Sequence, residues 1–134
     1  FIGHSNLLRG TIRVKDGRRH VVFADGFAVE MNHLVDTAVD GMEVIVAIRP
    51  EEFAVAEKGL NAQIHKDTFL GQNMNYQIRF ADQMSCNPEL INEFVQDMGT
   101  AQTFYHENDK ICLVVPAQLY HVLCIRPHTS FYPA

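Results

Sequence analysis

Alternation of apolar and polar residues is the feature that most restricts how this sequence can fold. In residues 42–49 the side chains of Met42, Val44, Val46 and Ile48 occupy every second position, and Pro50 follows. Residues 74–80 and 60–69 show a comparable pattern. A period of two places alternate side chains on opposite faces of a strand. The sequence therefore predicts β-strands with one buried face, the first ending at Pro50, which has no amide hydrogen for a sheet.

Short turn sequences separate these strands. Gly71 lies in the link 70–73 between two predicted strands, and Asp16-Gly17 links residues 8–14 to residues 20–24. Glycine tolerates the positive φ that a tight hairpin turn requires. The same pattern of runs and turns predicts three further strands, at residues 27–31, 110–115 and 120–125.

One segment departs from the alternation. Between Asn87-Pro88 and Gly99, five apolar residues recur at helical spacing: Leu90, Ile91, Phe94, Val95 and Met98. Asparagine suits a helix N-cap, proline the first helical position and glycine the residue after a helix. We expect one short helix near residues 88–98.

Two short phrases repeat in the same order. Phe-Ala-Asp occurs at residues 23–25 and 80–82, and Ile-Arg-Pro occurs at residues 48–50 and 125–127. The repeats indicate either two related β-units or chance. We expect an all-β fold of about eight to ten short strands, forming one or two small OB-like barrels. Residues 1–134 form one domain in this prediction, with possible units at 6–50 and 60–127.

Composition excludes several classes of protein. The 134 residues carry 11 Lys and Arg against 16 Asp and Glu, a net charge of -5, and no large basic cluster. This charge pattern argues against nucleic acid as a partner. No apolar run has the length of a membrane span. The three cysteines form no paired framework, which favours reduced thiols in a cytosolic compartment.

Motifs of catalysis are missing from the sequence. A P-loop ends in Gly-Lys followed by Ser or Thr, and none of the four lysines follows a glycine. His121, Cys124 and His128 are close in sequence, but residues 121 and 124 face opposite sides of a strand. We therefore predict no catalytic residue and no metal site, and expect that this segment is not an enzyme.

Two longer phrases resemble a known family. The run Val46-Ala47-Ile48-Arg49-Pro50-Glu51, followed by a strand from Asn61 and by Phe69-Leu70-Gly71, resembles the TOBE domain of ABC importer ATP-binding subunits. Residues 1–10 look like that family's junction with the ATPase domain, and residues 116–123 look like its closing strand. Residues 83–107 depart from the family, because they are longer and predicted to be helical.

The resemblance implies a non-catalytic regulatory and dimerisation domain, preceded by an ATPase domain that would hold ATP and magnesium. It implies a cytoplasmic location at the inner face of the membrane. The partners would be a second copy of the subunit and the transporter's membrane subunits. Exposed strand edges and the apolar face of the predicted helix would form the contact between copies.

The candidate ligand-binding or interface residues are Arg49, Glu51, Gly71 and Arg126. Arg49 precedes Pro50 and is therefore held extended, with Glu51 close by for an ion pair or an anion contact. A structural surface pair is the alternative role for Arg49 and Glu51, and a turn is the alternative role for Gly71. The alternative function is a stand-alone module that binds a small oxyanion such as molybdate, sulfate or a carboxylate through Arg49 or Arg126.

Overall fold

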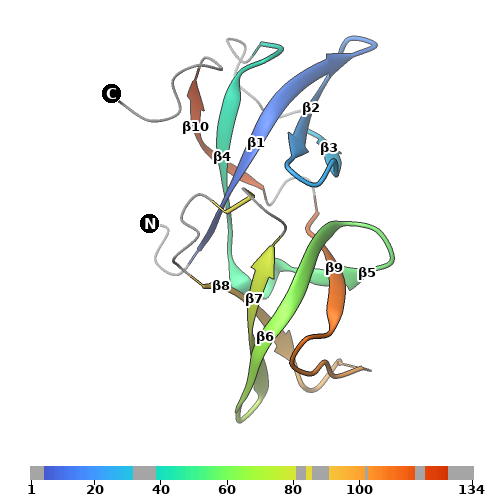
Figure 1. Cartoon of the computed structure of the whole chain (residues 1–134), viewed down its shortest axis with the longest axis vertical. Coiled ribbons are helices and arrows are strands. Elements are labelled where there is room, and N and C mark those ends of the chain that lie inside the picture. The colour runs from blue at the N-terminus through green and yellow to red at the C-terminus, as the bar shows by residue number, and fades with distance from the viewer. Residues whose placement is uncertain are drawn as a thin grey trace.

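A computed structural model describes residues 5–31, 39–80, 84–85, 91–101, 103–116 and 120–126, with only the backbone described for residues 121 and 123–126. The described residues form two antiparallel five-stranded sheets and no α-helix. A single turn of 3-10 helix, η1 (Pro50–Glu52), joins the two sheets. This arrangement confirms the all-β prediction and is consistent with a small OB-like fold (Figure 1).

Sheet A contains the first four strands and the last one. Its spatial order is β10-β4-β1-β2-β3. The strands are β1 (Asn6–Lys15), β2 (Arg18–Phe23), β3 (Ala28–Glu30), β4 (Glu43–Ile48) and β10 (His121–Arg126). Asp16 and Gly17 both have positive φ, 54° and 76°, as the tight turn between β1 and β2 requires.

Sheet B contains the strands between β4 and β10. Its spatial order is β5-β9-β6-β7-β8. The strands are β5 (Ala54–Ala56), β6 (Leu60–Leu70), β7 (Asn73–Phe80), β8 (Asn92–Asp97) and β9 (Lys110–Val114). A bulge in β6 between Ile64 and Lys66 shifts its register against β7.

The prediction of a helix near residues 88–98 is wrong for residues 92–97, which the structure describes as a strand. Residues 92–97 form β8, which pairs antiparallel with β7 from Asn73↔Asp97 to Ile78↔Asn92. The ring of Phe94 points into the core and stacks on Tyr76, with ring centroids 5.4 Å apart. Pairing with β7 overrides the helical spacing of the apolar residues. Residues 88–90 lie outside the described part of the chain.

The last strand lies in sheet A, although residues 121–126 fall within the predicted unit 60–127. β10 pairs antiparallel with β4, from His121↔Ala47 to Arg126↔Glu43. The second copies of the two repeated phrases, at residues 80–82 and 125–127, include residues 81–82 and 127, which lie outside the described residues. The division into units 6–50 and 60–127 remains a prediction.

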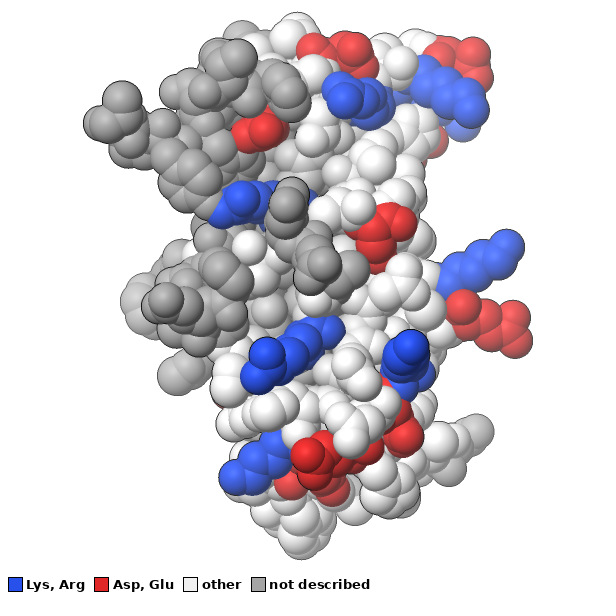
Figure 2. Space-filling view, viewed as in Figure 1, with Lys and Arg blue, Asp and Glu red and all other residues white. Residues whose placement is uncertain are grey.

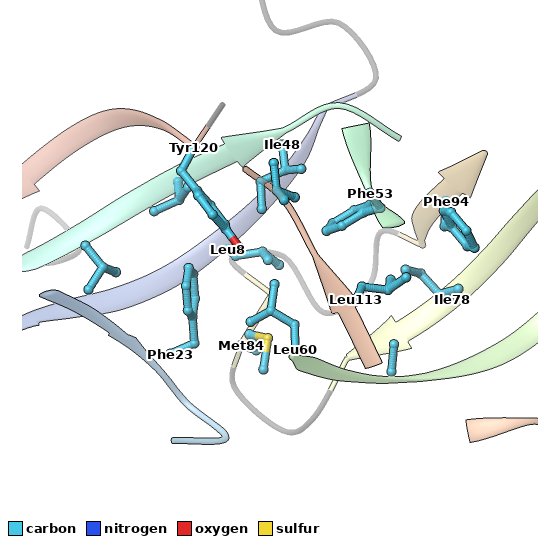
Figure 3. Close-up of a cluster of buried hydrophobic side chains, with 14 of the residues drawn as sticks. Leu8, Phe23, Ile48, Phe53, Leu60, Ile78, Met84, Phe94, Leu113 and Tyr120 are labelled. Atoms are coloured by element: carbon cyan, nitrogen blue, oxygen red, sulfur yellow. The ribbon is translucent and has the colours of Figure 1, made fainter. Parts of the chain in front are cut away.

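One hydrophobic core lies between the two sheets. Leu8, Phe23 and Ile48 enter it from sheet A, and Leu60, Phe94 and Leu113 enter it from sheet B (Figure 3). These side chains are at most 2% exposed. They occupy alternate strand positions, so the alternation in the sequence corresponds to the two inner faces of this core.

Two polar contacts also join the sheets. The buried Asn6 side chain on β1 donates to the carbonyl of Glu93 and accepts from its amide, at 2.8 Å in each case. The carboxylate of Asp25, in the β2–β3 turn, accepts from the backbone and side-chain nitrogens of Asn61 at 2.8 and 2.9 Å. The two sheets are therefore held together by hydrogen bonds as well as by apolar burial.

Candidate functional site

A hollow lies along sheet B. It has a volume of about 770 Å³ and receives residues from β5, β6, β7 and β9. Its polar lining residues are Glu57, Asn61, Gln63, Arg79, Tyr105, Lys110 and Cys112. We call this hollow the sheet B groove. Its size lies within the usual range of small-molecule sites.

Strand register places two cations and an amide in one row across the sheet B groove. Gln63 on β6 is opposite Arg79 of β7 on one side and opposite Lys110 of β9 on the other. Residues directly opposite in antiparallel strands point to the same face of the sheet. The row Lys110, Gln63 and Arg79 therefore presents two positive charges on either side of a hydrogen-bonding amide.

The cations of this row are free to meet a ligand. All three side chains are exposed, and the ion pairs found among the described residues include neither Arg79 nor Lys110. Gln63 donates from Nε2 to the carbonyl of Asn108 at 3.2 Å, which leaves its side-chain oxygen available. Glu57 also lines the groove and contributes a negative charge there. Guanidinium and ammonium groups in such a row suit a carboxylate or phosphate ligand.

A small hydrogen-bonded network lies at one part of the groove. The Cys112 thiol contacts the side-chain oxygen of Asn61 at 3.3 Å, and Asn61 is held by Asp25 of the β2–β3 turn. Cys112 is a free, half-buried cysteine. Cys86 lies outside the described residues. The network fixes the side chain of Asn61 and gives the groove a defined polar wall.

A second, smaller hollow separates the outer strands of sheet B. It has a volume of about 370 Å³ and lies between β5 and β8. Phe53, Phe94 and Tyr105 contribute aromatic surface, while Glu51 and Asp97 contribute carboxylates. We call it the β5–β8 groove.

Two buried tyrosines have raised pKa values. Burial raises the pKa of Tyr76, although its oxygen accepts a hydrogen bond from the Tyr105 amide at 3.1 Å, which acts in the opposite direction. Burial also raises the pKa of Tyr120 to about 12. Desolvation disfavours the phenolate, so both residues stay neutral at physiological pH. The Tyr76 hydroxyl acts as a structural hydrogen-bonding group, because it donates to Gln96 and accepts from the Tyr105 amide.

Arg49 and Glu51 occupy the exposed end of β4 and the start of η1. The Arg49 amide donates to Oε1 of Glu52 at 2.8 Å, and the ion pairs among the described residues do not include Arg49 with Glu51. Glu51 instead lines the β5–β8 groove. The backbone amide of Arg49 therefore bonds to the Glu52 side chain and not to Glu51.

The other two predicted residues lie elsewhere. Gly71 has a φ of +71° in the β6–β7 turn, and a Cβ there would meet nothing within 4 Å. Arg126 pairs with Glu43, at the end of β4 opposite to Arg49, and its side chain lies outside the described residues. The structure therefore does not bring Arg49, Gly71 and Arg126 together. Their ligand-binding or interface roles remain predictions.

Sequence reasoning missed the row in the sheet B groove. Arg79 and Lys110 occupy alternate positions on their strands, which marks each as facing outward. Their common position beside Gln63 depends on two strand registers, one of them shifted by the β6 bulge. The alternation in the sequence indicated that each residue faces outward. It did not indicate that the three residues lie side by side.

The surface shows no single charged field on the face seen in Figure 2. Blue Lys and Arg residues alternate with red Asp and Glu residues along that face.

Within the described residues there is no cluster of three or more His, Cys, Asp and Glu side chains that could hold a metal. His128 and the side chains of His121 and Cys124 lie outside the description. Nowhere in the described part of the chain does an apolar helix reach membrane-spanning length.

Comparison with known proteins shows a partial relationship. No family model matches the chain. Over 89 residues the chain is 33% identical to the spermidine/putrescine import ATP-binding protein PotA of Rubrobacter xylanophilus. The match covers 61% of this chain but 23% of that protein's length. The chain is thus a partial homologue of an import ATP-binding protein.

Proposed function

We propose that this chain is a non-catalytic regulatory and dimerisation domain of an ABC transporter ATP-binding protein. The partial homology to an import ATP-binding protein carries the proposal. The all-β fold supports the proposal of a domain separate from the ATPase domain. The sequence also lacks the Gly-Lys-Ser/Thr phosphate loop on which such an ATPase depends, which supports a non-catalytic role. ATP and magnesium would then bind to another part of the parent protein.

The proposed location is the cytoplasmic face of the membrane, where the parent subunit would contact the transporter's membrane subunits. A second copy of the subunit is the proposed dimer partner. Since the segment expected to be an apolar helix is strand β8, the contact surface would come from sheet edges and exposed side chains. A specific dimer would bury about 1,200 Å² or more in total.

The gene upstream of the codon for Phe1 gives the most direct test. The proposal predicts an open reading frame that continues upstream and encodes a P-loop followed by an ABC signature. A reading frame that starts within a few codons of Phe1 would refute it.

Dimerisation has its own test in analytical ultracentrifugation of the chain at tens of micromolar. We expect a concentration-dependent dimer. A species that remains monomeric over this range would remove the dimerisation role, while leaving the relationship to the transporter intact.

The sheet B groove favours a second candidate function, the binding of a small anion. Arg79 and Lys110, which form no ion pair within the described part of the chain, flank Gln63 on a chain whose net charge is -5. Calorimetric titration with phosphate, sulfate, molybdate and citrate would reveal binding to this row. Arg79→Gln and Lys110→Gln should each weaken it about tenfold, as the loss of one charge-assisted contact predicts.

Lys66→Gln is the matched control for this titration. Lys66 is an exposed cation on β6 that does not line the groove, and its replacement should leave the affinity unchanged. Equal weakening by all three substitutions would indicate a general effect of net charge. Absence of heat with every anion would eliminate the second function.

A further inference from the structure

The outward edge of β8 is partly occupied by a side chain that imitates a peptide group. β8 pairs with β7 along one edge, and Glu93 turns its amide and carbonyl away from β7. Both groups bond to the side-chain amide of Asn6, at 2.8 Å each. A primary amide here donates and accepts as a neighbouring strand would. This edge therefore already supports strand-like pairing.

The next residue with the same orientation is Val95. Residues two apart on an antiparallel strand direct their backbone groups to the same side, so Val95 also faces away from β7. Among the described residues, no hydrogen bond is made to its outward amide or carbonyl. Val95 lines the β5–β8 groove, which provides room beside these groups. Asn6 occupies the outward groups of Glu93, and the outward carbonyl of Asp97 accepts from the amides of the following turn. Among the described residues, Val95 is therefore the open position of this edge. An open position on a strand edge beside a hollow is a site at which an extended segment can pair.

Charge around this edge distinguishes between possible occupants. Antiparallel pairing of two β8 strands about Val95 would place Glu93 of one copy opposite Asp97 of the other. Like charges directly opposite each other destabilise a strand pair. Glu51 and Asp97 line the β5–β8 groove, and none of the described residues lining it is basic. The groove therefore suits a strand that carries a positive charge.

We propose that the edge of β8 at Val95 binds an extended, basic segment of another protein by strand addition. The backbone of the segment pairs with the amide and carbonyl of Val95. A Lys or Arg two residues from the paired position faces Asp97. Tyr105, which is half-buried and lines the groove, supplies apolar surface beside the added strand.

The test uses the chain labelled with nitrogen-15 and the hexapeptide acetyl-Thr-Lys-Val-Val-Thr-Val-amide. The amide resonance of Val95 should shift and its hydrogen exchange should slow, with saturation at millimolar peptide. N-methylation of the fourth peptide residue should abolish both effects, because it removes the hydrogen that bonds to the Val95 carbonyl. Replacement of the peptide's lysine by glutamate should weaken binding about threefold or more.

Two substitutions in the chain complete the test. Val95→Pro removes the outward amide hydrogen without removing a hydrogen bond to β7, and proline is tolerated at such an edge position. This variant should keep its circular dichroism spectrum and lose peptide binding. The Asp97 carboxylate accepts from the Gly99 amide at 2.8 Å, and Asp97→Asn retains an oxygen for this bond. The Asp97→Asn variant should lose the preference for the lysine peptide over the glutamate peptide. Asp67→Asn, an equal charge change on β6, should bind as the parent chain does.

Three results would overturn the proposal. The Val95 amide could stay unchanged at millimolar peptide, or the N-methylated peptide could bind as well as the parent peptide. The third is a Val95 resonance that changes with protein concentration in the absence of peptide, which would identify a second copy as the occupant. If Val95→Pro does not fold, the comparison of the two peptides still decides.

Discussion

The two sheets of this molecule contribute different kinds of side chain to their shared core. The inner face of sheet A is mainly aliphatic, with Leu8, Ile12, Val21, Val44 and Val46 fully buried. Sheet B instead holds a group of aromatic rings: Phe53, Tyr76, Phe80, Phe94 and Tyr105. Aliphatic burial dominates in sheet A, where Phe23 and Tyr120 form a ring contact, while several ring contacts and hydrogen bonds add to burial in sheet B.

A hydrogen-bonded chain illustrates the difference. The Tyr76 hydroxyl bonds to Gln96 at 3.1 Å and accepts from the Tyr105 amide, while Gln96 donates to the Thr103 carbonyl at 2.9 Å. This chain holds residues 103–105 against sheet B. The sheet that carries both grooves is thus the one with a polar framework, which limits how far its lining residues can move.

The largest expected effect comes from Phe94→Ala in sheet B. Phe94 is 2% exposed and contacts the rings of both Tyr76 and Phe53, so its truncation should lower the free energy of unfolding by about 3–5 kcal/mol. Ile12→Ala in sheet A should cost about 2–5 kcal/mol. In urea denaturation followed by circular dichroism and by tyrosine fluorescence, each variant should keep a single transition. Two separated transitions would show that the sheets unfold independently, contrary to a shared core.

Asn6→Ala should have the next largest effect, because it breaks the buried link between the sheets. The substitution leaves the amide and carbonyl of Glu93 without partners near a side chain that is 3% exposed. We expect a loss of about 2 kcal/mol in the free energy of unfolding. The rate of amide hydrogen exchange should increase more at Glu93 than at Phe94. Unchanged exchange at Glu93 would show that this link is not needed for contact between the sheets.

Asp25→Ala tests the second and more exposed link. It removes the acceptor for both nitrogens of Asn61 and for the Phe27 amide, at 3.1 Å, and should cost about 1 kcal/mol. Asn61→Ala is the matched comparison, since it retains the backbone bond to Asp25 and should cost less. A loss for Asp25→Ala as large as that for Asn6→Ala would contradict the greater importance of the buried link.

The smallest effect at neutral pH concerns Tyr120. Its pKa is raised from 10.0 to about 12 by burial, so the folded state holds this proton more tightly than the unfolded chain does. The contribution to stability is complete below pH about 10 and is lost as the pH rises toward about 12. Urea midpoints across this range should fall less steeply for Tyr120→Phe than for the parent chain. An identical slope would mean that Tyr120 titrates normally.

Prediction from sequence worked where the strand pattern was long and regular. β4, β6 and β7 follow the alternation closely, and the turns at Gly17 and Gly71 lie where glycine was expected to adopt positive φ. β5 was missed because its three residues are all apolar and show no alternation, whereas the equally short β3 follows the turn residues Asp25-Gly26. β8 was assigned to a helix because the apolar residues of this segment recur at helical spacing, and pairing with β7 overrides that local pattern.

The candidate sites were less accessible than the fold. Arg49 was chosen for its position before Pro50, a local property that the sequence displays directly. Arg79, Gln63 and Lys110 come together through pairings between distant strands. The free backbone groups of Val95 depend on which side of β8 faces β7. Such features arise from long-range register, which a single sequence does not encode in any short window.

The position of β10 has a consequence for the order of folding. The open edge of β4 can be completed only after every strand of sheet B has been synthesised, because its partner β10 follows all of them in the chain. A nascent chain would thus carry an unfinished first sheet while the second one assembles. Premature pairing of that edge with a neighbouring nascent chain is therefore a hazard that this topology creates, and holding the edge apart would be a natural task for a chaperone.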